Sequence, residues 1–211
     1  MKTAWMITIM MTTMTAAAMN AVAGTEGMKR TITIYMIDKR EGSSYPLNLA
    51  ERYASRIFAT VGLDVEWRSG KPAAAPSPTG RTFVIEVADR TPATDHSGAL
   101  AYALPYEGVH IRLFFDRIAA MGKRWPDAIL AHVLAHVLAH EITHMLEGVP
   151  RHSLTGVMKA TFTPDDVIVM CSRPMTFAPE DVTLIDLGIR HRDRIEHAVA
   201  SAATARMSSL R

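Results

Sequence analysis

The residues with the clearest chemical potential are two histidines and a glutamate in the segment HEITH, which runs from His140 to His144. In a helix, residues four apart lie one turn apart on nearly the same face, so these two histidines can direct ring nitrogens at one cation. Glu141 lies beside the pair, where its carboxylate can act on a water bound to the same metal instead of binding the metal. The segment therefore predicts a metal site suited to hydrolysis.

A third ligand is expected from the residues that follow this segment. Gly148 stands four residues after His144, where a helix is expected to stop, and Pro150 prevents its continuation. The chain must turn there. His152 then arrives eight residues after His144, a distance from which a loop can bring it back to the cation. Three protein ligands with a fourth position open to water describe a catalytic zinc site.

The segment from His140 to Ala160 reads HEITHMLEGVPRHSLTGVMKA. It resembles the metzincin clan of zinc peptidases, whose motif is HExxHxxGxxH with a later methionine turn beneath the metal. The spacing here is HExxHxxxGxxxH, one residue longer on each side of the glycine. The segment is still more similar to a group of predicted secreted bacterial zinc-peptidase-like proteins that share the longer loop and an H-S-x-x-G-x-M ending. The resemblance implies three zinc ligands, a general base and a turn methionine, which are His140, His144 and His152, Glu141, and Met158.

Glu180 is the alternative third ligand. In gluzincins, the other large class with an HExxH motif, a downstream helical glutamate binds the metal, and Glu180 lies at the start of a predicted helix. A carboxylate in the first turn of a helix also stabilises the helix dipole without binding a metal. The sequence favours His152 and leaves Glu180 as its competitor.

The helix that carries HEITH is expected to be buried. Pro126 and Asp127 suit its first turn, and the residues from Ala128 to Glu147 are apolar nearly all round. His132 and His136 continue the four-residue spacing upstream, but each step advances about 40° around the axis. Neither is followed by a glutamate. We expect both to be hydrogen-bonded structural residues, with support of the zinc ligands as the alternative.

Alternating and helical patterns predict the elements around this helix. Residues 30–38 and 63–68 indicate two strands, and apolar residues at helical spacing in 47–61 indicate a helix between them. This opening favours a parallel strand pair with a right-handed crossover. Further strands are expected at 81–89, 99–104 and 108–118, and helices from about residue 163 and from 179 to 195.

The predicted fold class is α/β (α+β), with a metzincin-like mixed sheet packed on the central HExxH helix. A Met-turn and a C-terminal helix are expected to follow. In peptidases of this type an edge strand above the metal helix pairs with extended substrate, and residues 99–104 are the segment expected to do so. An ordinary strand is the alternative at this position.

The first 23 residues predict an export signal. They hold Lys2, an apolar run rich in Met, Ile and Ala, and the cleavage site Ala21-Val22-Ala23 before Gly24. A membrane anchor is the alternative, but several threonines interrupt the apolar run. We expect a signal peptide at 1–23, a zinc metallopeptidase domain at 24–200 and a flexible tail at 201–211.

Charge and cysteine content restrict the partners and the compartment. Without Lys2, 22 of the 23 basic residues remain against 21 acidic ones, a net charge of +1. This balance argues against nucleic acid as a partner, because phosphate binding needs a clustered basic surface. Cys171 is the single cysteine, so the chain can form no internal disulfide. We expect a secreted or periplasmic bacterial protein with no stable membrane insertion after signal removal.

The leading functional hypothesis is a secreted zinc metalloendopeptidase that hydrolyses peptide or protein substrates through a zinc-bound water, with Glu141 as the general base. Tyr102 or Tyr106 could stabilise the oxyanion, since no tyrosine closely follows Met158. One alternative is a non-catalytic, zinc-binding exported protein that binds peptides or cell-wall components, although binding alone would not require Glu141. Another is an accidental HExxH in a core helix. The sequence predicts neither cleavage specificity nor oligomeric state.

Overall fold

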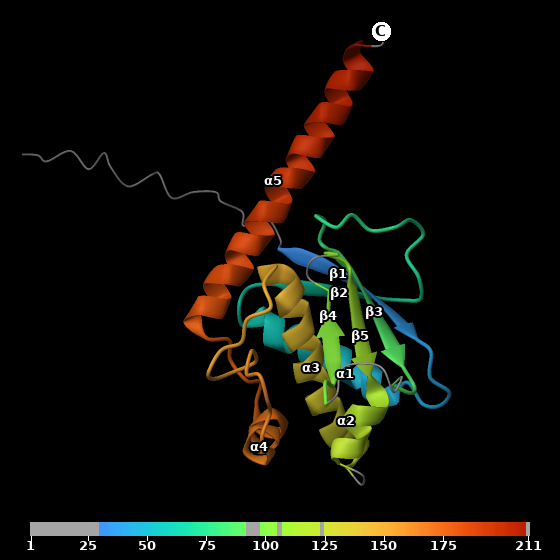
Figure 1. Cartoon of the computed structure of the whole chain (residues 1–211), viewed down its shortest axis with the longest axis vertical. Coiled ribbons are helices and arrows are strands. Elements are labelled where there is room, and N and C mark those ends of the chain that lie inside the picture. The colour runs from blue at the N-terminus through green and yellow to red at the C-terminus, as the bar shows by residue number, and fades with distance from the viewer. Residues whose placement is uncertain (1–29, 92–97, 105–106, 123–124, 210–211) are drawn as a thin grey trace, which may run out of the picture.

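The computed structural model describes residues 30–91, 98–104, 107–122 and 125–209, and the predicted signal peptide at 1–23 lies outside them. Over these residues the chain forms one five-stranded sheet and five helices (Figure 1). The strands are β1 (Thr31–Asp38), β2 (Asp64–Ser69), β3 (Thr82–Ala88), β4 (Ala101–Ala103) and β5 (His110–Phe114). The helices are α1 (Tyr45–Ala59), α2 (Phe115–Met121), α3 (Asp127–Glu147), α4 (Pro164–Ser172) and α5 (Pro179–Ser209).

The sheet is mixed, with the strand order β2-β1-β3-β5-β4. The first four of these strands run parallel, and β4 pairs antiparallel with β5 at the edge. The side chains of Ile32, Ile34 and Met36 alternate with less buried neighbours, so β1 presents one face to the core. Since α1 connects β1 to its parallel partner β2, the predicted β-α-β opening is confirmed.

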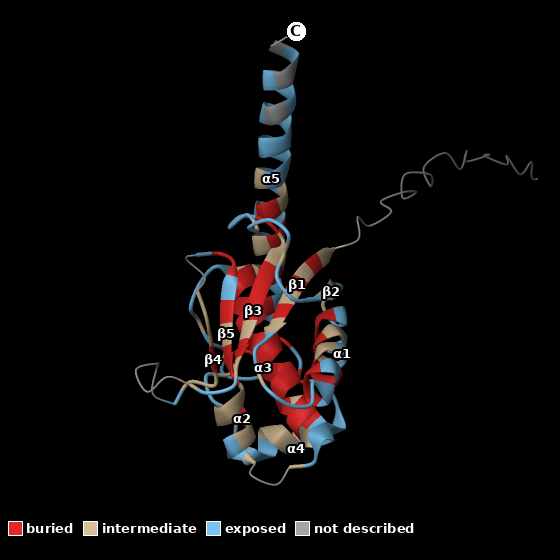
Figure 2. Cartoon of the chain, turned by 90° about the vertical axis from the view of Figure 1, so that its right-hand side faces the viewer, coloured by how far each residue is buried: buried red, intermediate tan, exposed pale blue. Residues whose placement is uncertain are grey.

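The core lies between the sheet and α3, which α1 flanks (Figure 2). The residues of α3 from Leu130 to Leu146 are almost all buried. In the described part of the chain α3 is also the one helix long and apolar enough to cross a membrane, but 83% of that stretch is buried inside the fold. It is therefore the core helix that the sequence predicts.

Both ends of α3 follow the local signals. Pro126 precedes the helix and Asp127 lies in its first turn, where a carboxylate favours the positive end of the dipole. At the other end Gly148 has φ +69°, and its N–H donates to the carbonyl oxygen of His144 over 2.9 Å. Glycine adopts this left-handed conformation without strain, so the helix stops where predicted.

The boundary between β5 and α2 differs from the expectation. The strand ends at Phe114 and the helix begins at the next residue, so the prediction of a strand over 108–118 is wrong beyond Phe114. The carboxylate of Asp116, in the first turn of α2, accepts hydrogen bonds from the N–H and hydroxyl of Thr91 at 3.0 and 2.6 Å. Contacts with a residue 25 positions away thus help to fix this boundary.

The closing helix is longer than predicted. It was expected to end near Ile195, but α5 continues to Ser209 and projects from the body of the protein (Figure 1). Residues 201–209, expected to be part of a flexible tail, are helical. This Ala-rich segment contains no glycine or proline after Gly188, so no local stop signal opposes the helix. From Glu196 onward its described side chains are exposed.

Candidate metal centre

Three imidazole rings meet at the C-terminal half of α3. His140 and His144 lie one turn apart on the helix, and His152 returns from the loop that follows Gly148. The first two ring centroids are 4.7 Å apart, and the His152 centroid lies 5.2 and 5.1 Å from them. Ligand nitrogens of the three rings lie within 4.8 Å of one another, so the cluster is able to hold a metal ion. The structure brings together the three histidines that the sequence suggests as ligands.

Hydrogen bonds fix the tautomers of the two helical histidines. The Nδ1 atom of His140 lies 2.9 Å from the carbonyl oxygen of Val157, and that of His144 lies 3.3 Å from the carbonyl oxygen of Val149. Because a carbonyl oxygen only accepts, each Nδ1 carries the proton and donates it. The two Nε2 atoms, 3.0 Å apart, then carry no proton and cannot hydrogen-bond each other. Two unprotonated nitrogens this close fit a shared cation, since the ligand atoms of a tetrahedral zinc site lie about 3.3 Å apart.

Burial keeps these two rings neutral near pH 7. Desolvation lowers the pKa of His140 and of His144 from the ordinary value of 6.5 to about 4. The neutral imidazole is the form that binds a metal. Both rings can therefore take up a cation without first losing a proton.

The loop that carries His152 is joined to the segment around Met158. The N–H of Ser153, the residue after this histidine, donates to the carbonyl oxygen of Met158 over 2.8 Å, and an isolated parallel bridge pairs Ser153 with Lys159. The Met158 side chain is fully buried. The expected turn at this methionine is thus present and connected to the third histidine.

Gly156 makes the turn possible. Its φ is +79°, and a Cβ at this position would lie 2.1 Å from the carbonyl oxygen of Thr176. The same oxygen accepts the N–H of Val157 at 3.0 Å. Because the Val157 carbonyl oxygen accepts from His140, the close backbone approach at Gly156 sets the position of that ring.

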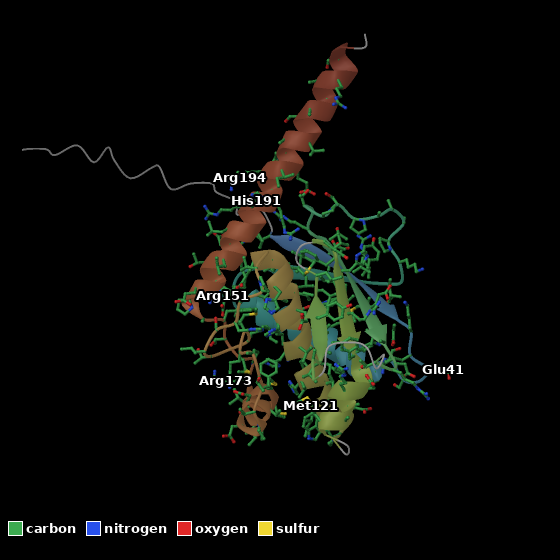
Figure 3. All side chains as sticks on the ribbon, viewed as in Figure 1. Glu41, Met121, Arg151, Arg173, His191 and Arg194 are labelled. Atoms are coloured by element: carbon green, nitrogen blue, oxygen red, sulfur yellow. The ribbon has the colours of Figure 1, made fainter. Side chains whose placement is uncertain are left out.

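Glu141 lines a cavity of about 560 Å³ together with the three histidines. Residues 98–103, which include β4, form another wall of the cavity, and Phe162 and Met121 contribute apolar surface. Met121 is the last residue of α2 (Figure 3). Burial raises the pKa of Glu141 to about 8, and a hydrogen bond from the backbone of Ala103 opposes that rise. A bound cation would also lower this pKa. Glu141 is therefore a carboxyl group that can exchange a proton beside the cluster.

The two upstream histidines have structural partners. The Nδ1 atom of His136 lies 2.7 Å from the carbonyl oxygen of His132, and its Nε2 accepts the N–H of Met175 at 3.1 Å. The ring of His132 stacks on Tyr53 with centroids 4.0 Å apart. Neither histidine belongs to the candidate metal cluster found among the described residues. His136 is thus a hydrogen-bonded structural residue, as expected, and ties α3 to the loop before α5. The ring of His132 is held by its stacking on Tyr53.

Glu180 lies outside the cluster. Its side chain is 80% exposed and forms an ion pair with Arg151 at 3.2 Å. This placement favours His152 over Glu180 as the third ligand. Of the two candidate tyrosines, Tyr102 of β4 lines the cavity and Tyr106 lies outside the described residues.

Asp181 is a further residue of the site that the sequence pattern does not reveal, and its buried carboxylate binds the residues on both sides of His152. Its only local signal was an acidic residue in the first turn of a helix, which indicates an interaction with the helix dipole. Nothing in the sequence pairs it with a loop about 30 residues earlier.

No protein-family model and no curated protein matches this sequence. Among solved structures, the chain is similar to the crystal structure of archaemetzincin from Methanopyrus kandleri, with a TM-score of 0.52. The match covers 79% of this chain and 99% of the archaemetzincin chain, at 12% sequence identity. The chain has an archaemetzincin-like fold. The likeness confirms the predicted mixed α/β architecture around a central HExxH helix, and the archaemetzincin-like fold places three histidines and a glutamate at one cavity.

Proposed function

We propose that the chain is a zinc-dependent metallopeptidase in which His140, His144 and His152 hold the ion and Glu141 is the general base. The observation that carries the proposal is the convergence of three imidazoles beside a buried glutamate in one cavity. Three protein ligands that leave a fourth position open are typical of catalytic zinc sites, whereas structural sites use four.

The donor atoms fit zinc. Imidazole nitrogen suits this ion, and two of the rings have their Nδ1 protons bound to carbonyl oxygens, the supporting arrangement common at zinc sites. When bound, zinc would supply Lewis-acid polarisation of a substrate carbonyl and of the attacking water.

Glu141 would perform the proton transfers. Its carboxylate accepts a proton from the attacking water and delivers it to the leaving amine, so the peptide bond is replaced by a carboxylic acid and an amine. Burial of its carboxyl group favours holding that proton between the two steps. The hydrogen bond from Ala103 orients the carboxyl group toward the cavity wall formed by β4.

An extended peptide is the proposed substrate. β4 is one of the two edge strands of the sheet and lines the cavity, which supports its pairing with an extended chain. We further propose that the mature protein acts outside the bacterial cytoplasm, on the basis of the export signal expected at residues 1–23.

The test is a Glu141→Gln variant of the mature chain, incubated with a mixture of unfolded proteins whose new amino termini are read by mass spectrometry. Hydrolysis should fall at least 100-fold, because a general base typically contributes about that much or more, while zinc content stays unchanged. Glu107→Gln, at an exposed glutamate outside the cavity, is the matched control and should retain full hydrolysis. Undiminished turnover in the Glu141 variant would exclude the mechanism. A zinc-loaded parent that cleaves nothing would favour the non-catalytic alternative.

A further inference from the structure

The buried carboxylate of Asp181 links the start of α5 to the loop that carries the third histidine. Its side chain is 0% exposed. Its Oδ1 accepts hydrogen bonds from the guanidinium of Arg151 and from the hydroxyl of Ser153, each at 2.6 Å. Its Oδ2 accepts the N–H of Ala178 at 2.9 Å, which fixes the carboxylate at the start of α5. Three donors thus hold one buried carboxylate in place.

The two side chains that Asp181 binds flank His152 in the sequence. The Nη2 atom of Arg151 also donates to the hydroxyl oxygen of Ser153 over 3.1 Å, so these two side chains lie on the same side of the loop. Asp181 therefore contacts the loop on the side that carries Arg151 and Ser153. Arg151 lies beside the first turns of α5 (Figure 3). The ring of His152 faces the other way, toward His140 and His144.

A second carboxylate confines the guanidinium of Arg151. Glu147, in the last turn of α3, has a side chain that is 0% exposed, and its Oε1 lies 3.6 Å from Arg151 Nη1. Neither of its oxygens has a hydrogen-bond partner among the described residues. The guanidinium lies between the end of α3 and the start of α5, so the loop is tied to both helices. The ion pair between Arg151 and Glu180 is exposed to solvent and contributes little to holding the guanidinium in place.

His152 depends on this support more than the other two rings do. His140 and His144 project from a rigid, buried helix, and their Nδ1 atoms are bound to carbonyl oxygens. His152 is exposed, stands in a loop, and has no hydrogen bond from its ring to any described residue. Its position is therefore set through its neighbours.

From these contacts we infer that Asp181 is the positioning residue of the metal centre. It acts through Arg151 and Ser153 to hold His152 at ligand distance from the other two histidines. The inference rests on the proposed function, because it assigns a role within the zinc site described there.

The test measures zinc affinity of the mature chain by competition with a chromophoric chelator. Asp181→Ala should weaken zinc binding tenfold to hundredfold, the range expected when the partner that orients a ligand is lost. Asp186→Ala is the matched control, since it removes another paired aspartate of the same helix without contact to the loop, and its affinity should equal that of the parent.

A double-mutant cycle separates positioning from general destabilisation. In a His152→Ala background, Asp181→Ala should weaken zinc binding by less than twofold, because the ligand it positions is already gone. The cobalt-substituted Asp181 variant should also show the altered visible spectrum of the His152 variant. An equal loss of affinity in both backgrounds, or an unchanged cobalt spectrum, would overturn the inference.

Two variants that each remove a single donor to the Asp181 carboxylate keep the inference testable if Asp181→Ala does not fold. The variants are Arg151→Met and Ser153→Ala. Each should weaken zinc binding severalfold when His152 is present and should have no effect in the His152→Ala background. No effect from either would contradict the role. If His152→Ala loses zinc but the Asp181, Arg151 and Ser153 variants bind like the parent, only the positioning role fails. A parent chain without zinc affinity overturns this role and the proposed function together.

Discussion

The Nδ1 atom of His140 lies 2.9 Å from the carbonyl oxygen of Val157, and this hydrogen bond joins the HExxH helix to the turn that holds Met158. The bond fixes both the tautomer and the direction of the ring, because the protonated Nδ1 leaves Nε2 free to bind a cation. It depends in turn on the neighbouring Gly156, whose backbone approaches Thr176 too closely for any side chain.

Gly156→Ala should therefore destabilise the protein by roughly 2–4 kcal/mol, because a Cβ would meet the Thr176 carbonyl oxygen at 2.1 Å and the φ of +79° disfavours alanine. Urea unfolding of the metal-free chain measures the change. Gly70→Ala is the matched control, with φ +86° and open space around the added atom, and should cost only about 1 kcal/mol. Equal losses of unfolding free energy at the two positions would show that the close approach of Gly156 to Thr176 does not affect stability.

His136 should make the stability of the metal-free protein depend on pH. Burial lowers the pKa of His136 from 6.5 to about 4, so between these values the unfolded chain binds more protons than the folded one. The contribution of His136 to the free energy of unfolding is therefore fully present above pH 6.5. It is lost as the pH falls from 6.5 toward 4, and the total loss is roughly 3 kcal/mol at most. Urea unfolding at pH 7 and pH 5 should give a smaller difference for His136→Gln than for the parent. His191→Gln, at an exposed histidine of α5 (Figure 3), should show the same difference between pH 7 and pH 5 as the parent. Equal differences for the two variants would refute the prediction.

Arg192 should be one of the most important polar residues for stability. It is buried, and its guanidinium donates to the carbonyl oxygens of Pro78 and Gly80 at 3.1 and 2.6 Å and to that of Met145 at 2.6 Å. Arg192→Met leaves these acceptors without their donor and should cost about 2–4 kcal/mol in the free energy of unfolding. Arg190→Met removes an exposed ion pair on the same helix and should cost under about 1 kcal/mol. A negligible effect at Arg192 would mean that water replaces the guanidinium.

The last turns of α5 should be dispensable for the core. The described side chains from Glu196 onward are exposed, so their removal takes little apolar area out of the fold. A chain that ends at Glu196 should keep its unfolding free energy within about 0.5 kcal/mol and bind zinc as the longer chain does. Loss of folding on truncation would show that this segment packs against something the exposed side chains do not reveal.

The sequence predicted what short-range patterns encode. The four-residue spacing of His140 and His144, the stop at Gly148 and the return of His152 lie within 13 residues, so helix geometry and turn chemistry were enough to bring them together. The apolar surface all round α3 likewise predicted a core helix.

What the sequence could not predict depends on contacts between distant residues. Thr91 binds Asp116 at the start of α2, and this partner is invisible to a local pattern that favours a strand. Asp181 has the local appearance of a dipole-stabilising acid, and its bonds to Arg151 and Ser153 cross about 30 residues. The length of α5 was missed for a different reason, because an Ala-rich exposed helix carries no apolar face to mark its extent.

The three-histidine zinc site is tested most directly by the zinc content of the purified mature chain beside that of its His152→Ala variant. We expect about one zinc per chain in the parent and a loss of affinity in the variant well beyond 100-fold, because a direct ligand should matter more than a supporting residue. Full zinc retention in the variant would contradict the assignment of His152. Absence of zinc from the parent under zinc-replete conditions would contradict the metal centre itself.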